Sequence, residues 1–186
     1  MAKCLEIQDL ICKEKLDVLC LNETNLKSDI DSASLNLPKN FAFIRKDRSN
    51  DNGRGGCGIL ISEHIKFKTV HLILVLKYDQ IEAIWIHLTD CNIYICCFYR
   101  SETFSPLDKF LDYMTDCMMS IGSKNVIWLG DVNIDQNNIS SMKNKKLDIT
   151  MKMFGMVQVV QDITRVAKLG NRVTKTTIDV VITDNY

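Results

Sequence analysis

The chain has 186 residues, of which 46% are hydrophobic; this is enough for one substantial core, so we expect residues 1–186 to form a single domain. Lys and Arg together number 23, as do Asp and Glu, so bulk charge does not predict strong non-specific attraction to nucleic acid, and any such binding needs a local basic patch. The eight cysteines form no C-x-x-C pair and no stretch approaches the ~18 apolar residues of a membrane span, which argues against a zinc module, a disulfide scaffold or a membrane protein and predicts a reduced intracellular chain, nuclear or cytoplasmic.

The first half of the chain is predicted to be mostly strands after one helix. Cys4, Ile7 and Ile11 fall at helical spacing, which indicates an amphipathic helix around residues 3–14. Apolar runs bounded by polar or turn residues then predict strands at 16–21, 41–44, 58–62, 67–75, 81–88 and 92–99.

The second half alternates helices and strands. Residues 105–121 carry apolar side chains at three- and four-residue intervals, and we expect Ser105 to cap this helix and Pro106 to occupy its first turn. A second helix is expected at 142–154, before Gly155, and further strands at 126–129, 157–160 and 177–183. This mixed order favours two packed sheets flanked by helices over a doubly wound Rossmann sheet.

A Gly-rich run at residues 53–58 matches the G-x-G-x-x-G pattern of dinucleotide-binding proteins. That interpretation requires a strand before the run and a helix after it. Here a polar loop precedes the run and the strand at 58–62 follows it, so we expect these glycines to permit a tight turn into a hairpin strand.

Polar side chains follow three of the apolar strands. Glu23 could be a ligand of Mg²⁺, or a solvated or helix-capping carboxylate. Asp131 and Asn133, on a segment expected to be extended, would point the same way and could act on water and phosphate, or could close an Asx turn. Tyr99 and Arg100 could both bind phosphate, or could be a packed ring beside a solvated charge.

Asp179 stands within an otherwise apolar strand, and a buried acid needs a partner. Orienting a catalytic histidine is one known use of such an acid. The three histidines, His64, His71 and His87, all lie upstream, and the sequence places none of them as that partner.

Seven segments, taken in order, resemble the endonuclease/exonuclease/phosphatase superfamily, and specifically the endonuclease domain of LINE-type (non-LTR) retrotransposons, a relative of apurinic/apyrimidinic endonucleases and DNase I. The segments are 16–24, 54–59, 82–86, 98–101, 128–133, 164–166 and 178–183. The resemblance implies a four-layer α/β sandwich of the DNase I-like type. It also implies a DNA substrate and, in the full-length element, a reverse transcriptase domain as partner.

Roles for individual residues follow from the resemblance. It implies that Glu23 binds Mg²⁺ or Mn²⁺. It implies that Asp131 and Asn133 align the attacking water and the scissile phosphate, that Tyr99 hydrogen-bonds the phosphate, and that Asp179 orients a catalytic His. Arg100, Thr164 and Arg165 would bind the substrate.

Two departures from the family pattern bear on activity. Family members begin with a strand carrying an active-site Asn, and they end with a Ser-Asp-His run on a last strand. Neither is found in this sequence, so we expect the fold to lack its first and last core strands and the activity to be weak or absent. The alternatives are a non-catalytic remnant of the domain and a small-molecule phosphoesterase of the same superfamily.

Overall fold

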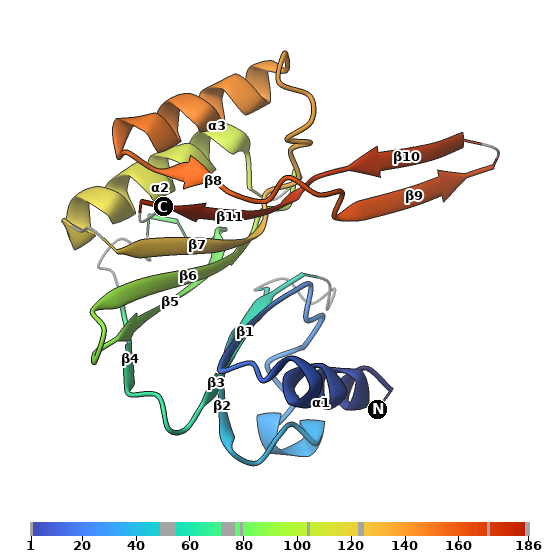
Figure 1. Ribbon diagram of the computed structural model, residues 1–186, viewed down its shortest axis with the longest axis vertical. Coiled ribbons are helices and arrows are strands. Elements are labelled where there is room, and N and C mark those ends of the chain that lie inside the picture. The colour runs from blue at the N-terminus through green and yellow to red at the C-terminus, as the bar shows by residue number, and fades with distance from the viewer. Residues whose placement is uncertain are drawn as a thin grey trace.

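A computed structural model describes residues 2–48, 55–71, 77–78, 80–103, 105–122, 125–170 and 172–184 of the chain (Figure 1). The polar loop at 49–54, the first two residues of the Gly-rich run and the end of the strand expected at 67–75 lie outside these ranges. None of the helices in the described ranges is long and apolar enough to cross a membrane.

The observed elements follow the predicted order closely. In chain order they are α1 (Ala2–Glu14), β1 (Val18–Asn22), the 3-10 helix η1 (Ser32–Leu35), β2 (Phe41–Lys46), β3 (Cys57–Ser62), β4 (Phe67–Thr69), β5 (Glu82–Leu88), β6 (Ile93–Tyr99), α2 (Leu107–Ile121), β7 (Val126–Asp131), α3 (Met142–Met153), β8 (Val157–Gln158), β9 (Arg165–Leu169), β10 (Arg172–Thr176) and β11 (Asp179–Thr183). Neither η1 nor the β9–β10 hairpin was predicted from the sequence.

Apart from β9 and β10, which form a separate two-stranded sheet, the strands form two packed sheets, as predicted. The larger sheet has the order β4-β5-β6-β7-β11-β8, and the smaller has the order β1-β3-β2. Helices α2 and α3 cover one face of the larger sheet, the smaller sheet covers part of the other face, and α1 lies beyond the smaller sheet (Figure 1). The pair β6–β7 is parallel and its neighbours in the larger sheet are antiparallel, so the sheet is mixed.

Two apolar cores hold these layers together. One lies between the larger sheet and helices α2 and α3, and is centred on Trp128, Phe98 and Phe110. The other lies between the two sheets and includes Ile59, Ile86 and Cys97. Four of the eight cysteines are buried in these cores, as expected for cysteines used as small apolar residues: Cys57, Cys96, Cys97 and Cys117.

Ser105 does not cap helix α2, contrary to the prediction. Pro106 occupies the N-cap position and makes no side-chain cap. The hydroxyl of Ser105, which is 1% exposed, instead donates to the backbone carbonyl of Gln80, 2.9 Å away. A buried hydroxyl needs a partner, and the nearby chain before β5 offers one that the local sequence cannot reveal.

Candidate active site

Three ionisable side chains lie in one row across the larger sheet. The strand register pairs Tyr99 of β6 with Asp131 of β7, and pairs Asp131 with Asp179 of β11. Directly opposed residues on neighbouring strands present their side chains to the same face. The phenol and the two carboxylates therefore gather at one end of the sheet.

Glu23 reaches this row from the smaller sheet. It follows the last residue of β1 and has a left-handed backbone, with φ at +51°. The hydroxyl of Tyr99 donates a hydrogen bond of 2.6 Å to Oε1 of Glu23. The ends of β1, β6 and β7 thus converge.

These residues line a pocket of about 440 Å³. Its walls come from five separate parts of the chain: Glu23, Tyr99, Asp131, Asn133, Thr164, Arg165, Ile178 and Asp179. Among the side chains that the sequence assigned to catalysis, metal binding or substrate binding, only Arg100 is missing from this set.

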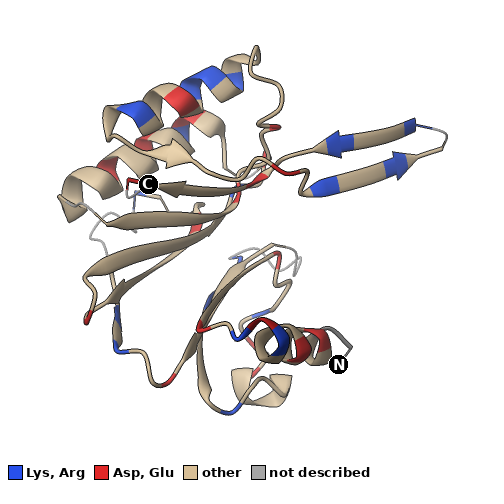
Figure 2. Cartoon of the chain, in the orientation of Figure 1, with Lys and Arg blue, Asp and Glu red and all other residues tan. Residues whose placement is uncertain are grey.

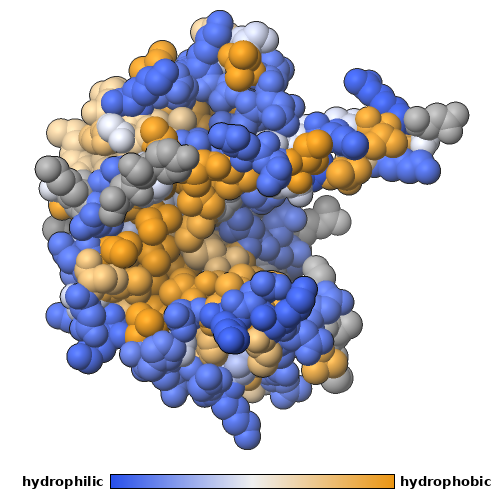
Figure 3. Space-filling model, viewed as in Figure 1, coloured by the Kyte–Doolittle hydropathy of each residue, from blue (hydrophilic) through white to orange (hydrophobic). Residues whose placement is uncertain are grey.

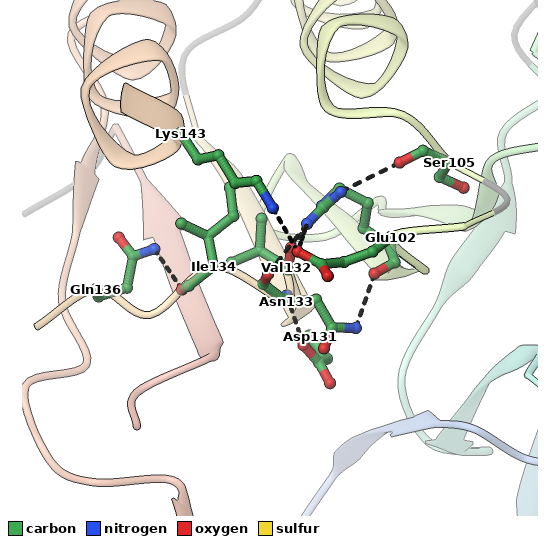
Figure 4. Close-up of polar contacts among 9 residues, drawn as sticks. Glu102, Ser105, Asp131, Val132, Asn133, Ile134, Gln136 and Lys143 are labelled. Carbon is green, nitrogen blue, oxygen red and sulfur yellow. Dashed lines mark hydrogen bonds and ion pairs between the residues drawn. The ribbon is translucent and has the colours of Figure 1, made fainter. Parts of the chain in front are cut away.

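The chain turns directly after Asp131, the last residue of β7, so the segment that carries Asn133 is not extended. The backbone of Asn133 is left-handed, with φ at +49°, and its N–H donates to Oδ1 of Asp131 over 2.7 Å. This is the Asx turn that the sequence left open. Figure 4 shows the two side chains next to each other, and both line the pocket, so the turn and the functional interpretation are compatible.

Arg100 occupies a place different from the one expected. Its side chain is 2% exposed, and its guanidinium donates to the carbonyls of Val132, Ser105 and Asn133 (Figure 4). In return, Nδ2 of Asn133 donates to the carbonyl of Arg100 over 2.8 Å. Because its donors serve main-chain carbonyls, Arg100 fixes the turn that carries Asn133 and does not face the pocket.

Gly130 has a packing role. A Cβ atom at this position would collide with the carbonyl oxygen of Phe98 on the neighbouring strand. The structure shows that Gly130 lets β6 and β7 lie close together beside Asp131.

Burial and neighbouring charge change the ionisation of two pocket residues. Burial, with the negative charges of Asp179 and Glu23 adding to it, raises the pKa of Asp131 to about 6. Burial, followed by the hydrogen bond to Glu23, raises the pKa of Tyr99 to about 12. At neutral pH the Asp131 carboxylate is thus mostly ionised, while the phenol keeps its proton.

Asp179, Thr164 and Arg165 form another part of the pocket wall. Asp179 is the first residue of β11 and is half-buried, so it is not enclosed within the strand as the sequence suggested. Oγ1 of Thr164 accepts hydrogen bonds from the N–H groups of Ile178 and Asp179, each 3.1 Å long. Arg165 is exposed, and its positive charge partly offsets the rise in the pKa of Asp131.

None of the three histidines lines the pocket. His64 contacts Ser62 and Asp17, and His87 stacks on Tyr94. His71 lies beside a separate, mainly apolar pocket at β2 and β5. Asp179 therefore has no histidine partner among them.

Two residues that support the pocket were missed. With its amide oriented to pair both groups, Asn22 donates to the carbonyl of Phe98 and accepts from the N–H of Asp131, which ties β1 to β6 and β7. Glu82 is 4% exposed and pairs in register with Tyr99, one strand further along the row. The signal for Glu82 was available, because it is an acid opening an apolar strand, as Asp179 is.

The pocket fits a hard cation that keeps part of its water. Its donors are carboxylate, amide and phenol oxygens, which suit Mg²⁺ and Mn²⁺. Across the described ranges, no three His, Cys, Asp or Glu side chains are close enough to hold a metal ion by themselves. Mg²⁺ usually takes only one or two protein carboxylates, and the carboxylates of Glu23, Asp131 and Asp179 all line this pocket.

Comparison with known proteins identifies the fold. No protein-family model and no curated protein sequence matches the chain. Solved structures do match it, and one is the endonuclease domain of TRAS1, a telomere-specific non-LTR retrotransposon. That match has a TM-score of 0.75 at 13% identity and covers 98% of this chain and 79% of the other.

Two further solved structures are also similar. The 3′ phosphatase NExo from Neisseria, bound to a product DNA hairpin, gives a TM-score of 0.68 at 13% identity and covers 99% of this chain and 82% of the other. An AP endonuclease from Archaeoglobus fulgidus gives 0.65 at 13% identity, covering 97% and 81%. The chain therefore has the DNase I-like fold that these structures share, which is the fold that the sequence resemblance implied.

Proposed function

We propose that this pocket is the active site of a Mg²⁺- or Mn²⁺-dependent phosphodiesterase that acts on DNA, of the kind found in non-LTR retrotransposons. One observation carries the proposal: Glu23, Tyr99, Asp131, Asn133 and Asp179, contributed by four distant segments, line a single pocket. Proteins of this fold with other functions exist, so the function is argued from the site and not from the fold.

Glu23 would hold the cation, with water completing its coordination. A bound divalent ion would polarise a phosphoryl oxygen and offset the charge that develops during hydrolysis. The carboxylates of Asp131 and Asp179 add negative potential beside Glu23, which favours a cation over a free anion in this pocket.

The remaining pocket residues act on water and phosphate. Asp131, with a pKa of about 6, is mostly ionised at neutral pH and can accept a proton from an attacking water. The Asn133 side chain is anchored to the carbonyl of Arg100 and faces the same pocket. The Tyr99 hydroxyl can donate to Glu23, as it does here, or to a phosphate oxygen, but its single proton cannot serve both.

DNA is favoured as the substrate by the basic hairpin beside the pocket. Strands β9 and β10 project from the molecule as a hairpin (Figure 1), and Figure 2 shows basic residues along it and no acidic ones. Four basic residues lie between positions 165 and 176: Arg165, Lys168, Arg172 and Lys175. The chain is neutral as a whole, so this is the local basic patch that binding to a polyanion requires.

We further propose that hydrolysis by this 186-residue chain is slow. The pocket holds no histidine, and a positioned acid–base group contributes roughly 10²–10⁴-fold in rate. The same observation supports a second candidate function, a domain that binds metal and DNA without cutting. In a full-length element, either form would act beside a reverse transcriptase domain.

Binding of a fluorescein-labelled 30-base-pair duplex, followed by anisotropy with Mg²⁺ present, tests the substrate class. Arg165→Ala should weaken binding several-fold, because it removes a charge at the junction of pocket and hairpin. Lys13→Ala, in α1, is the matched control and should change nothing. A small-molecule phosphoesterase would instead show no duplex binding, even at low salt. It would hydrolyse bis(p-nitrophenyl) phosphate, and Arg165→Ala would not affect that hydrolysis.

A further inference from the structure

The carboxylate of Glu82, on β5 opposite Tyr99, is buried and makes two interactions. It pairs with Nε of Arg48, and its other oxygen accepts from the N–H of Gly56 over 2.8 Å. Glu82 itself is 4% exposed. A buried ion pair is weak evidence for stability, because desolvation opposes the attraction. The geometry around the pair shows what else it does.

The segment held by Glu82 in turn holds the residues after Glu23. The N–H of Thr24 donates to the carbonyl of Gly56, and the N–H of Asn25 donates to that of Gly55 over 2.8 Å. The side chain of Asn25 accepts from the N–H of Gly55 at 2.9 Å. These three bonds join residues 24–25 directly to residues 55–56.

Glycine at position 56 is needed for this contact. Its φ is +83°, a conformation that residues with a Cβ rarely adopt, and a Cβ there would press on the Thr24 hydroxyl. Part of the Gly-rich run that resembled a nucleotide-binding motif thus serves to bring two backbone segments together beside the pocket.

The same ion pair also reaches Tyr99. The guanidinium carbon of Arg48 lies 5.7 Å from the centroid of the Tyr99 ring, within the range of a cation–π contact. The hydroxyl of that ring donates to Glu23. Two chains of contacts therefore lead from the ion pair to Glu23. On one side Glu82 binds Gly56, which binds Thr24, the residue after Glu23. On the other side Arg48 contacts the ring of Tyr99, whose hydroxyl donates to Glu23.

We propose that the buried Arg48–Glu82 pair is a positioning element that fixes the Glu23 carboxylate and the Tyr99 phenol relative to each other. Neither Glu82 nor Arg48 lines the pocket, so the pair acts through the two residues that do. This proposal deepens the proposed function and rests on it, because the two positioned residues belong to the proposed active site. The contacts themselves do not depend on the reaction.

Glu82→Gln tests this role in the full chain. Glutamine keeps an oxygen for the N–H of Gly56 but loses the charge that pairs with Arg48. Mg²⁺ affinity by calorimetry should fall about tenfold, the low end of losses for residues that support a metal ligand. The pKa of Tyr99, measured by ultraviolet difference titration against Tyr99→Phe, should fall, because a displaced Glu23 no longer accepts the hydrogen bond from the Tyr99 hydroxyl.

Asp184→Asn is the matched control. Asp184 also holds two backbone N–H groups, those of Asn125 and Val126, but at the opposite end of β7. It should lower the melting temperature and leave Mg²⁺ affinity and the Tyr99 titration unchanged. If Glu82→Gln behaves in the same way as Asp184→Asn, the pair is structural only and the proposal is overturned.

Asn25→Gly guards against a Glu82 variant that does not fold. Asn25 has φ at +52°, which glycine tolerates, and the change removes only the side-chain bond to Gly55. It should lower the pKa of Tyr99 by a smaller amount, and no change would count against the proposal. If the unaltered chain binds no Mg²⁺, the proposed function fails, while the Tyr99 titration still decides the positioning.

Discussion

Asp131 and Asp179 are direct partners across the antiparallel strands β7 and β11, so two carboxylates share one end of the pocket. Like charges directly opposed in a sheet destabilise it. Burial raises the pKa of Asp131, and the charges of Asp179 and Glu23 raise it further. The pocket thus stores an unfavourable concentration of charge, which is typical of sites that bind cations or move protons.

Asp131→Asn should therefore stabilise the protein at neutral pH. The folded pKa of about 6 lies above the unfolded value of about 3.9, so the folded state retains its proton longer and stability falls as pH rises between these values. Asparagine keeps an oxygen for the turn and has no charge. Melting temperatures should coincide near pH 4, diverge up to pH 6 and then stay apart. A constant difference across that range would contradict the assigned pKa.

Glu23→Gln should weaken Mg²⁺ binding strongly, because a neutral amide replaces the carboxylate expected to hold the ion. Isothermal calorimetry on the purified chain measures the change. Glu63→Gln, at an exposed position after β3, is the control and should leave affinity as it was. Equal affinity in Glu23→Gln and the unaltered chain would remove Glu23 as the ligand.

Paired substitution of Lys168 and Arg172 by alanine should reduce the salt dependence of duplex binding. Each phosphate contact contributes about 0.9 to the slope of log affinity against log salt, so two lost contacts should lower the slope by about 1.8. Both residues are exposed on the hairpin, and stability should not change. The pair Lys13→Ala and Lys15→Ala, near α1, serves as control. An unaltered slope in the hairpin variant would show that the hairpin does not contact DNA.

Arg100→Met should destabilise the fold by about 3 kcal/mol, because buried carbonyls lose a charged donor. Urea unfolding gives this value, and exposed Arg165→Ala should stay within about 0.5 kcal/mol of the unaltered chain. The opposite pattern, with full stability and lost duplex binding in Arg100→Met, would restore the sequence-based assignment of Arg100 to the substrate.

Local patterns predicted most of the fold and most of the pocket. Apolar periodicity marked α2 and the buried strands, and polar residues at or just after the ends of those strands marked Glu23, Tyr99 and Asp131. The β9–β10 hairpin was not predicted because all but the last residue of its two strands are exposed, so neither strand has a buried apolar face that the sequence could reveal.

The remaining errors concern the choice of partner. Arg100 and Ser105 carry side chains that suit a ligand or a helix cap, yet both are buried against main-chain carbonyls. Glu82 pairs with Arg48, 34 positions away in sequence. Such pairings depend on how distant segments pack, and spacing along the chain does not encode them.

Nicking of supercoiled plasmid DNA in Mg²⁺ tests the central claim most directly. The chain should convert supercoiled to open circular DNA slowly, because its pocket holds no histidine to supply the roughly 10²–10⁴-fold rate contribution of a positioned acid–base group. Chelation of the metal, or Asp131→Ala, should abolish that conversion. Nicking that is equal in the unaltered chain and in Asp131→Ala would show that this pocket is not the active site.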